Sequence, residues 1–246
     1  MIITLMLYST IIINFVFTEA TAAVDHEVTE SLKCMRMFPH FEKKYSIPAD
    51  VLHSISLKES GKLHEIYKVK LPWPWAVNVE GRGYYFNNKS EAVSFVKKQI
   101  FLGKESIDIG CMQINLKHHP DAFSSLEHGF DPSSNVAYGA EFLKSKYNQL
   151  RSWHRAIAYY HSATSNLGYN YKKDIIKIIK NMNNHKNTLR KHVLSSHNDK
   201  NHQLVKPSGL TNLNRKEITR KSTSVKKPSD RFFQSRIHSN IMIPVY

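Results

Sequence analysis

Glu59 is the residue of this sequence whose position best fits acid catalysis. Residues 48–60 (PADVLHSISLKES) are expected to form a helix on which Leu52, Ile55 and Glu59 share one face. That face should meet the core, and burial disfavours a charged carboxylate, so the pKa of Glu59 should rise. A protonated carboxyl in an apolar cleft can donate a proton to an acetal oxygen. Taken alone, the pattern also fits a surface glutamate at a helix end.

Two later segments carry amide and phenol groups that could complete such a site. In residues 109–115 (IGCMQIN), the side chains of Gln113 and Asn115 offer donors and an acceptor, which suits a sugar hydroxyl or N-acetyl group. Gly110 would allow a backbone or ligand to approach closely. Residues 156–162 (AIAYYHS) contain two tyrosines. A buried tyrosine hydroxyl needs a hydrogen-bond partner, and a catalytic carboxyl would serve.

Three segments, in order and rough spacing, resemble motifs of the soluble lytic transglycosylase (SLT, goose-lysozyme-like) domain. They are residues 59–61 (ESG), 110–115 (GCMQIN) and 158–161 (AYYH), beside the family's E-S-G, G-[LC]-M-Q-[IV] and A-Y-[NH]. Residues 135–143 (NVAYGAEFL) resemble the family's helix between the second and third motifs. Residues 73–79 and 83–86 resemble the subgroup associated with secretion and conjugation machineries. The resemblance covers about residues 30–172.

The resemblance implies a mainly α, lysozyme-like domain with a cleft between two lobes. It implies that Glu59 is the single catalytic acid/base, cleaving the MurNAc–GlcNAc β-1,4 bond of peptidoglycan without water and leaving a 1,6-anhydro-MurNAc end. Tyr160 matches the family's tyrosine that contacts this glutamate. The resemblance further implies a substrate-binding set of Ser60, Met112, Gln113, Asn115, Tyr159 and His161. No cofactor is implied, and no metal is expected, because the histidines show no HExxH or Cys/His ligand spacing.

Departures from the family pattern leave alternatives open. Cys111 replaces leucine in the second motif, as in the Cys-bearing subgroup, and Tyr159 and His161 stand where Ala and Asn are commoner, so the roles of these two are open. A hydrolytic muramidase (lysozyme) usually employs a second carboxylate, for which Asp108 and Glu105 are candidates, although Asp108 is expected to cap or orient its loop. A non-catalytic protein that binds peptidoglycan or a secretion complex is a further alternative.

The N-terminus predicts export. Residues 1–17 are nearly all apolar, and Ala20-Thr21-Ala22-Ala23 offers a cleavage site after Ala22 or, as second choice, Ala23. Residues 1–22 are therefore expected to be a signal peptide, with an uncleaved membrane anchor as the alternative. The mature protein would be periplasmic or secreted. An oxidising compartment permits a disulfide between Cys34 and Cys111, the only cysteines, although two buried free thiols are the other possibility.

Hydrophobic periodicity and breakers outline a mostly helical core with one small hairpin. Further helices are expected over residues 90–102, 131–150, 153–162 and 169–191, with a β-hairpin over 73–86 and a short helical turn over 112–118. The predicted domains are the signal peptide, a catalytic domain over 23–190 and a tail over 191–246. From Arg190 onward twelve Lys/Arg face three Asp/Glu, so this tail should be disordered, and it could act as a basic arm.

Overall composition is that of an ordinary folded protein with an excess of positive charge. Apolar residues make up 41% of the chain, an ordinary value for a folded soluble protein, and the net charge is +15. Nine Gly and nine Pro exclude collagen-like and wholly low-complexity chains, and the single long apolar run, at the N-terminus, excludes a multi-pass membrane protein. Such a charge suggests an acidic partner, and peptidoglycan is anionic. The expected partners are glycan strands, with a secretion or conjugation complex as a further possibility and an acidic surface for the tail. No nucleic acid is expected for the core, and a monomer is expected.

Overall fold

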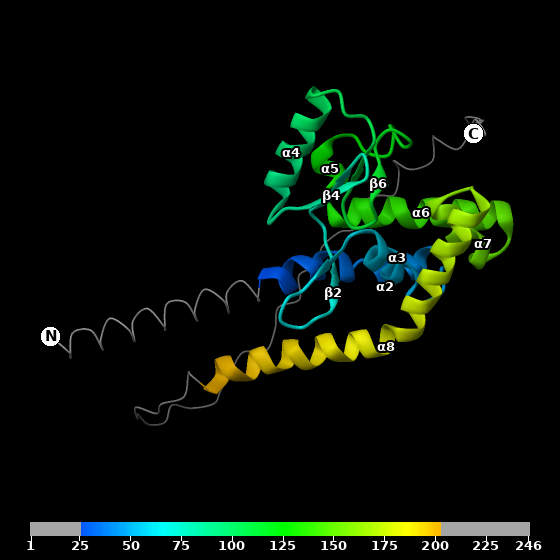
Figure 1. Cartoon of the computed structure of the whole chain (residues 1–246). Helices are drawn as coiled ribbons and strands as arrows, with labels where there is room; N and C mark the ends of the chain where they lie inside the picture. Colours follow the sequence, from blue (N-terminus) through cyan, green and yellow to red (C-terminus); the bar gives the residue numbers. More distant parts are fainter. Residues whose placement is uncertain (1–25, 203–246) are drawn as a thin grey trace, which may run out of the picture. The chain divides into compact units, whose positions relative to one another are not determined.

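The computed structural model describes residues 26–202, with side chains through residue 191. The chain is helical over residues 26–35 and then forms α2 (Phe38–Tyr45), α3 (Val51–Glu59), β1 (Gly61–Leu63), β2 (Lys70–Pro72), β3 (Ala76–Val79), β4 (Arg82–Tyr85), α4 (Lys89–Phe101), β5 (Ile107–Ile109), β6 (Ile114–Asn115), α5 (Leu126–Gly129), α6 (Pro132–Leu150), α7 (Trp153–His161) and α8 (Ser165–His202). The mainly α fold with a small antiparallel sheet is confirmed (Figure 1). Among the described helices, none combines the length and apolar character that a membrane span requires.

One lobe is built from helices around an apolar core. Leu52 and Ile55 of α3 are fully buried beside Leu143 of α6 and Ile175 of α8, so the apolar stripe of α3 does face the core. Residues Val51 to Leu57 of α3 are all buried. This burial fixes the position of the end of α3, where Glu59 stands.

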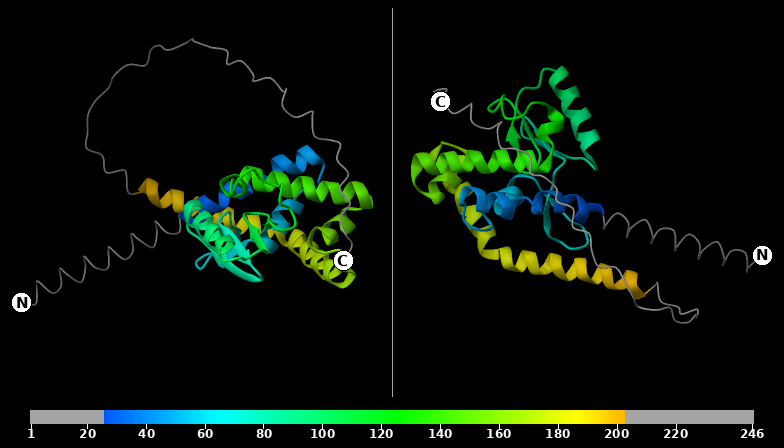
Figure 2. Two further views of the ribbon diagram at one scale, coloured as in Figure 1. Left: turned by 90° about the horizontal axis from the view of Figure 1, so that it is seen from above. Right: turned by 180° about the vertical axis from the view of Figure 1, so that it is seen from behind.

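The other lobe is a four-stranded antiparallel sheet in the order β4-β3-β5-β6, covered by α4. Its core includes Trp73, Val77, Ile109 and Phe130. The predicted hairpin of residues 73–86 is confirmed as β3 paired with β4. Its two turn residues, Glu80 and Gly81, have φ values of 50° and 88°. Two successive positive φ values suit the twist of a tight hairpin. In Figures 1 and 2, α6 runs between this sheet lobe and helices α2 and α3.

Several predicted helices are confirmed, and each begins at a polar cap. The cap side chains Asn88, Asp131 and Ser152 accept hydrogen bonds from backbone N–H groups in the first turns of α4, α6 and α7. Helix α3, however, begins at Val51 rather than at Pro48. Asp50 precedes it in a left-handed conformation (φ 67°) without a side-chain cap.

Two local expectations differ from the structure. The helical turn predicted over residues 112–118 is wrong, because positive φ at Gly110 and Gln113 reverses the chain and Ile114 pairs with Ile109 in a β5–β6 hairpin. Helix α3 ends at Glu59, and Gly61, just after the cap residue Ser60, starts β1 at a point where a Cβ would stand 2.2 Å from the Leu57 carbonyl oxygen. Helix α8 begins at Ser165, four residues before the predicted start at residue 169, and continues past the predicted end at residue 191 to His202. The predicted signal peptide and residues 203–246 lie outside the described residues.

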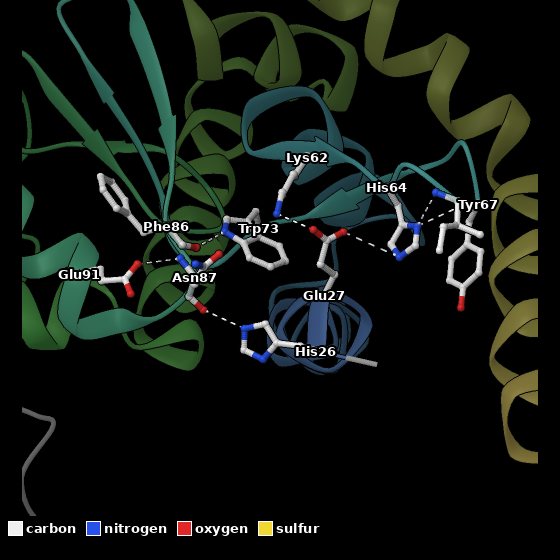
Figure 3. A network of polar contacts seen from close by, with 10 residues as sticks. His26, Glu27, Lys62, His64, Tyr67, Trp73, Phe86, Asn87 and Glu91 are labelled. Carbon is white, nitrogen blue, oxygen red and sulfur yellow. Dashed lines mark hydrogen bonds and ion pairs between the residues drawn. The ribbon is translucent and has the colours of Figure 1, made fainter. Parts of the chain in front are cut away.

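The N-terminal helical segment contacts β1, which pairs with β2, and the loop before α4. Glu27 lies between Lys62 (2.7 Å) and His64 (3.8 Å) of the β1 region, and His26 contacts the Asn87 carbonyl oxygen at 3.1 Å (Figure 3). From the same segment, Cys34 forms the predicted disulfide with Cys111, 77 residues later. The bridge anchors this segment on the turn between β5 and β6.

Candidate active site

The last residue of α3, Glu59, sits among titratable groups from three other elements. Burial is the largest cause that raises the pKa of Glu59 to about 7, from an ordinary value near 4.5. The Tyr171 hydroxyl of α8 and the Lys58 ammonium act in the opposite direction, and the charge of Asp108 on β5 raises the pKa further. A carboxyl with this pKa exchanges a proton readily near neutral pH.

Two tyrosines, the buried Tyr171 and the part-buried Tyr160, flank this carboxyl with different hydrogen bonds. Burial and the charge of Glu59 hold the pKa values of Tyr160 and Tyr171 well above the ordinary value, so both stay protonated. The Tyr160 hydroxyl donates to the Met112 carbonyl oxygen at 3.0 Å. The Tyr171 hydroxyl interacts with Glu59, yet it makes no hydrogen bond of ordinary geometry to a described residue. Tyr160, the tyrosine predicted to contact Glu59, is thus near the carboxyl, but its hydroxyl is hydrogen-bonded to a backbone carbonyl oxygen. Tyr171 is the tyrosine whose hydroxyl interacts with the Glu59 carboxyl.

His161 joins this cluster, whereas Tyr159 lies elsewhere. The His161 ring stacks on Tyr171 with centroids 4.6 Å apart and planes 5° from parallel. Burial and the positive charge of Lys58 lower the pKa of His161, while Asp108 opposes the shift. Tyr159 instead lines a separate surface pocket between α7 and the start of α8. Of the two uncertain members of the third motif, only His161 therefore stands among the groups around Glu59.

Ser60 and Met112 have no exposed surface, so in this structure their side chains support the site from within. The Ser60 hydroxyl lies 2.7 Å from the Cys111 carbonyl oxygen, an oxygen that also accepts a hydrogen bond from Ser56 at 2.7 Å. The backbone N–H of Trp73 donates to the Ser60 hydroxyl oxygen at 3.3 Å. These contacts join the end of α3 to the turn between β5 and β6.

That turn is held by Asn135, a fully buried residue of α6. The Asn135 oxygen accepts a hydrogen bond from the Met112 N–H at 2.8 Å. Its amide nitrogen donates to the carbonyl oxygens of Ile109 and Gly129 at 3.0 Å each. Gly110 has a φ of 77°, and a Cβ on it would stand 2.5 Å from the Asn135 amide, so glycine is required there for two reasons. The turn and α6 therefore fit one another closely.

Gln113 and Asn115 also brace the loop on which they stand. Gln113 has a φ of 46° and donates from its amide to the carbonyl oxygens of Ala76 (3.1 Å) and Gly110 (3.0 Å). The Asn115 amide donates to Asp108 at 2.9 Å, and its oxygen accepts from the N–H groups of the next turn. Both side chains are part-buried, so each keeps some surface that a ligand could reach.

The two candidate second carboxylates differ in environment. Glu105 is fully exposed and pairs with Lys117, which lowers its pKa. Asp108 is part-buried: burial raises its pKa, while the hydrogen bond from Asn115 lowers it. Asp108 is also close enough for its charge to raise the pKa of Glu59. Of the pair, only Asp108 shares the electrostatic environment of Glu59.

Sequence reasoning missed Tyr171 and the role of Asn135. Tyr171 stands four residues before Ile175 and eleven before Met182, on the apolar stripe of α8. A side chain that ends in a polar group, placed on the apolar stripe of a helix, is the same pattern that identified Glu59. Nothing in the local sequence of α6 shows that the amide of Asn135 meets a turn more than twenty residues earlier.

Comparison with known proteins gives one match. The family model described as the transglycosylase SLT domain matches residues 36–183, from the turn before α2 into α8. This range contains Glu59, Asp108, Tyr160 and Tyr171. No curated protein and no solved structure gives a significant match.

Proposed function

Because the chain belongs to the transglycosylase SLT domain family, we propose that it is a peptidoglycan lytic transglycosylase, cleaving the MurNAc–GlcNAc β-1,4 bond without water. The observation that supports this most directly is the carboxyl of Glu59, with a pKa of about 7, beside the buried Tyr171 and the part-buried Tyr160. One group that exchanges a proton at neutral pH suffices when a single residue acts first as acid and then as base.

The proposed reaction has two steps at Glu59. The protonated carboxyl donates its proton to the glycosidic oxygen, and the C1–O bond breaks with its electron pair moving to that oxygen. The resulting carboxylate then accepts the proton of the MurNAc C6 hydroxyl while this oxygen bonds to C1. The product ends in 1,6-anhydro-MurNAc, no water is consumed, and Glu59 is protonated again. The negative charge of Asp108 would favour the positive charge that develops at C1.

A hydrolytic muramidase is the second candidate function. It is supported by Asp108, a second carboxyl group close enough to Glu59 for its charge to raise the pKa of Glu59. In that mechanism Asp108 would activate a water molecule or stabilise a glycosyl intermediate while Glu59 acts as the acid. The two mechanisms differ in the chemical form of the new end, so the products distinguish them.

Mass spectrometry of purified peptidoglycan digested by the mature chain tests the proposal. We expect muropeptides ending in 1,6-anhydro-MurNAc, and no products from Glu59→Gln, with unchanged circular dichroism. Asp108→Asn should still give anhydro ends. Reducing ends that disappear in Asp108→Asn would instead establish hydrolysis. Full activity in Glu59→Gln would remove both mechanisms.

The biological setting is also a proposal. The apolar N-terminus and residues 20–23 support export to the periplasm or beyond. The segment of residues 73–86 supports a role in local wall opening for a secretion or conjugation apparatus. Alkaline phosphatase fused after residue 30 should be active in the periplasm of a Gram-negative host, whereas an inactive fusion would contradict export.

A further inference from the structure

A surface pocket lies where α7 ends and α8 begins. Its lining includes three basic side chains, His154, Arg155 and Lys172, and no acidic side chain. Hydroxyl groups of Ser162, Thr164 and Ser165 also line it, as do two exposed tyrosines, Tyr159 and Tyr169. The pocket therefore offers positive charge and hydrogen-bond donors beside aromatic surface.

Close packing of two helix ends builds this pocket. A Cβ on Gly168 would stand 2.8 Å from the Ser162 carbonyl oxygen and 3.1 Å from that of Ala158, so glycine lets α8 start against the end of α7. Lys172 lies over the Tyr169 ring, with its nitrogen 4.5 Å from the centroid. Both residues are thus held along one edge of the pocket.

The cations of the pocket are not neutralised by acidic neighbours. Within the described part of the chain, neither Arg155 nor Lys172 forms an ion pair. Arg155 donates one hydrogen bond, to the Leu150 carbonyl oxygen at 2.5 Å, which leaves further N–H groups of the guanidinium for a ligand. The start of α8 adds the partial positive charge of a helix N-terminus.

Charge along the chain points to the same region. Residues 132–191 carry eleven Lys/Arg and two Asp/Glu, a net charge of +9. Residues 26–131 carry fourteen Lys/Arg and thirteen Asp/Glu, a net charge of +1. The positive charge of the described region is thus concentrated in α6, α7 and α8, the elements that hold the pocket.

We propose that this pocket binds a carboxylate of the peptide stem carried by the glycan strand. The inference rests on the proposed function for the identity of the strand, and it adds a recognition site to it. Arg155 and Lys172 would bind the carboxylate, the hydroxyl groups would donate to peptide oxygens, and Tyr159 and Tyr169 would pack on the stem.

Proximity to Glu59 supports a ligand that belongs to the same strand. Ala158, Tyr159 and Ser162 line the pocket, while Tyr160 and His161 of the same turn of chain stand in the Glu59 cluster. Adjacent residues on a helix are separated by only about 1.5 Å along its axis. The pocket and the Glu59 cluster are thus built from the same segment of α7, which presents different faces to the two.

Kinetics on two forms of the substrate test the proposal. Glycan strands with intact stems are compared with the same strands after an amidase has removed the peptides. Two variants are compared with the wild type, Lys172→Gln and Arg155→Lys/Lys172→Gln. On intact strands we expect the KM of each to rise about tenfold, because a tenfold change corresponds to the loss of one charge-assisted hydrogen bond. The kcat of each should stay within about twofold of the wild-type value. On stripped strands the variants should match the wild type. The control is Lys173→Gln, an exposed neighbour that does not line the pocket.

Direct binding keeps this test separate from that of the proposed function. Isothermal titration of the mature chain with a free stem tetrapeptide should give binding that Lys172→Gln weakens about tenfold and Lys173→Gln does not. This binding measurement tests the pocket even if neither form of the strand is cleaved. Absence of cleavage would contradict the proposed enzymatic function but not the proposed binding site. Equal effects of the variants on both strands would overturn the proposal. So would binding of inorganic phosphate that depends on Lys172 when the peptide does not bind.

Discussion

Burial of the Glu59 carboxyl has a cost in folding free energy that depends on pH. Its pKa is about 7 in the folded chain, against 4.5 ordinarily, so the folded state keeps a proton that the unfolded chain releases between these values. Stability is then lost as pH rises through that window, and the cost is complete above about pH 8. A group that is kept buried at such a cost is a candidate for function.

Glu59→Gln should therefore stabilise the protein at alkaline pH. The amide carries no charge to desolvate, so we expect its free energy of unfolding to exceed that of the wild type by about 1–3 kcal/mol at pH 8, and by nearly nothing at pH 4. Urea denaturation followed by circular dichroism measures the difference. Glu42, whose pKa is also raised to about 7, is present in both proteins and cancels. The exposed Glu141→Gln is the control, and an equal gain at both pH values would contradict the prediction.

At the scale of residues, the sequence predicts which side chains can take part in chemistry better than it predicts which of them are exposed. The position of Glu59 follows from its spacing to Leu52 and Ile55, because a helix stripe is a local property. Ser60 and Met112 were expected to bind substrate, but their lack of exposed surface depends on packing against the turn at Cys111 and against α6. Contacts of this kind join segments about 25 to 50 residues apart, and no local pattern reports them.

The turn between β5 and β6 depends on α6 for its shape. Three backbone groups of the sheet lobe, at Met112, Ile109 and Gly129, have the Asn135 side chain as their partner. A Cβ on Gly139 would stand 2.9 Å from the Met112 side chain and 3.1 Å from the Tyr160 hydroxyl. Helix α6 therefore positions the turn and a tyrosine beside Glu59 together.

Asn135→Ala should be strongly destabilising. It leaves one buried N–H and two carbonyl groups without their side-chain partner, so we expect a loss of about 2–4 kcal/mol in the free energy of unfolding. Chemical denaturation measures it, with Asn148→Ala, an exposed position on the same helix, as a control expected to change stability by less than about 0.5 kcal/mol. A loss below about 1 kcal/mol for Asn135→Ala would show that the turn holds without this amide.

Elements are predictable from sequence when they are long enough to show a period. Helices α4, α6 and α7 begin and end within about one residue of expectation, because Asn88, Asp131, Ser152 and Gly103 mark their limits. The hairpins β1–β2 and β5–β6 have strands of two or three residues, too short for an alternating pattern. Helix α5, with four residues, was missed for the same reason.

For the described molecule as a whole, the disulfide joins the N-terminal helical segment to the turn between β5 and β6, next to the candidate site. Cys34 belongs to the N-terminal helical segment, and Cys111 belongs to the turn between β5 and β6. The backbone carbonyl oxygen of Cys111 accepts hydrogen bonds from the Ser56 and Ser60 hydroxyls. Both cysteines are fully buried. The sequence predicts the pair from the cysteine count and from expected export, whereas its place beside the Glu59-bearing helix depends on the fold.

Removing this bridge should weaken the whole domain. Closing a loop of 77 residues restricts the unfolded chain, so Cys34→Ala/Cys111→Ala should lower the free energy of unfolding by about 3–5 kcal/mol. Urea denaturation with and without reductant measures the effect: the wild type should lose this stability in reductant, and the variant should not respond. A wild type indifferent to reductant would contradict both the stabilising role and the benefit of folding in an oxidising compartment. If the loss is found, the stability of the protein depends on the export that its N-terminus predicts, because the disulfide would not form in a reducing cytoplasm.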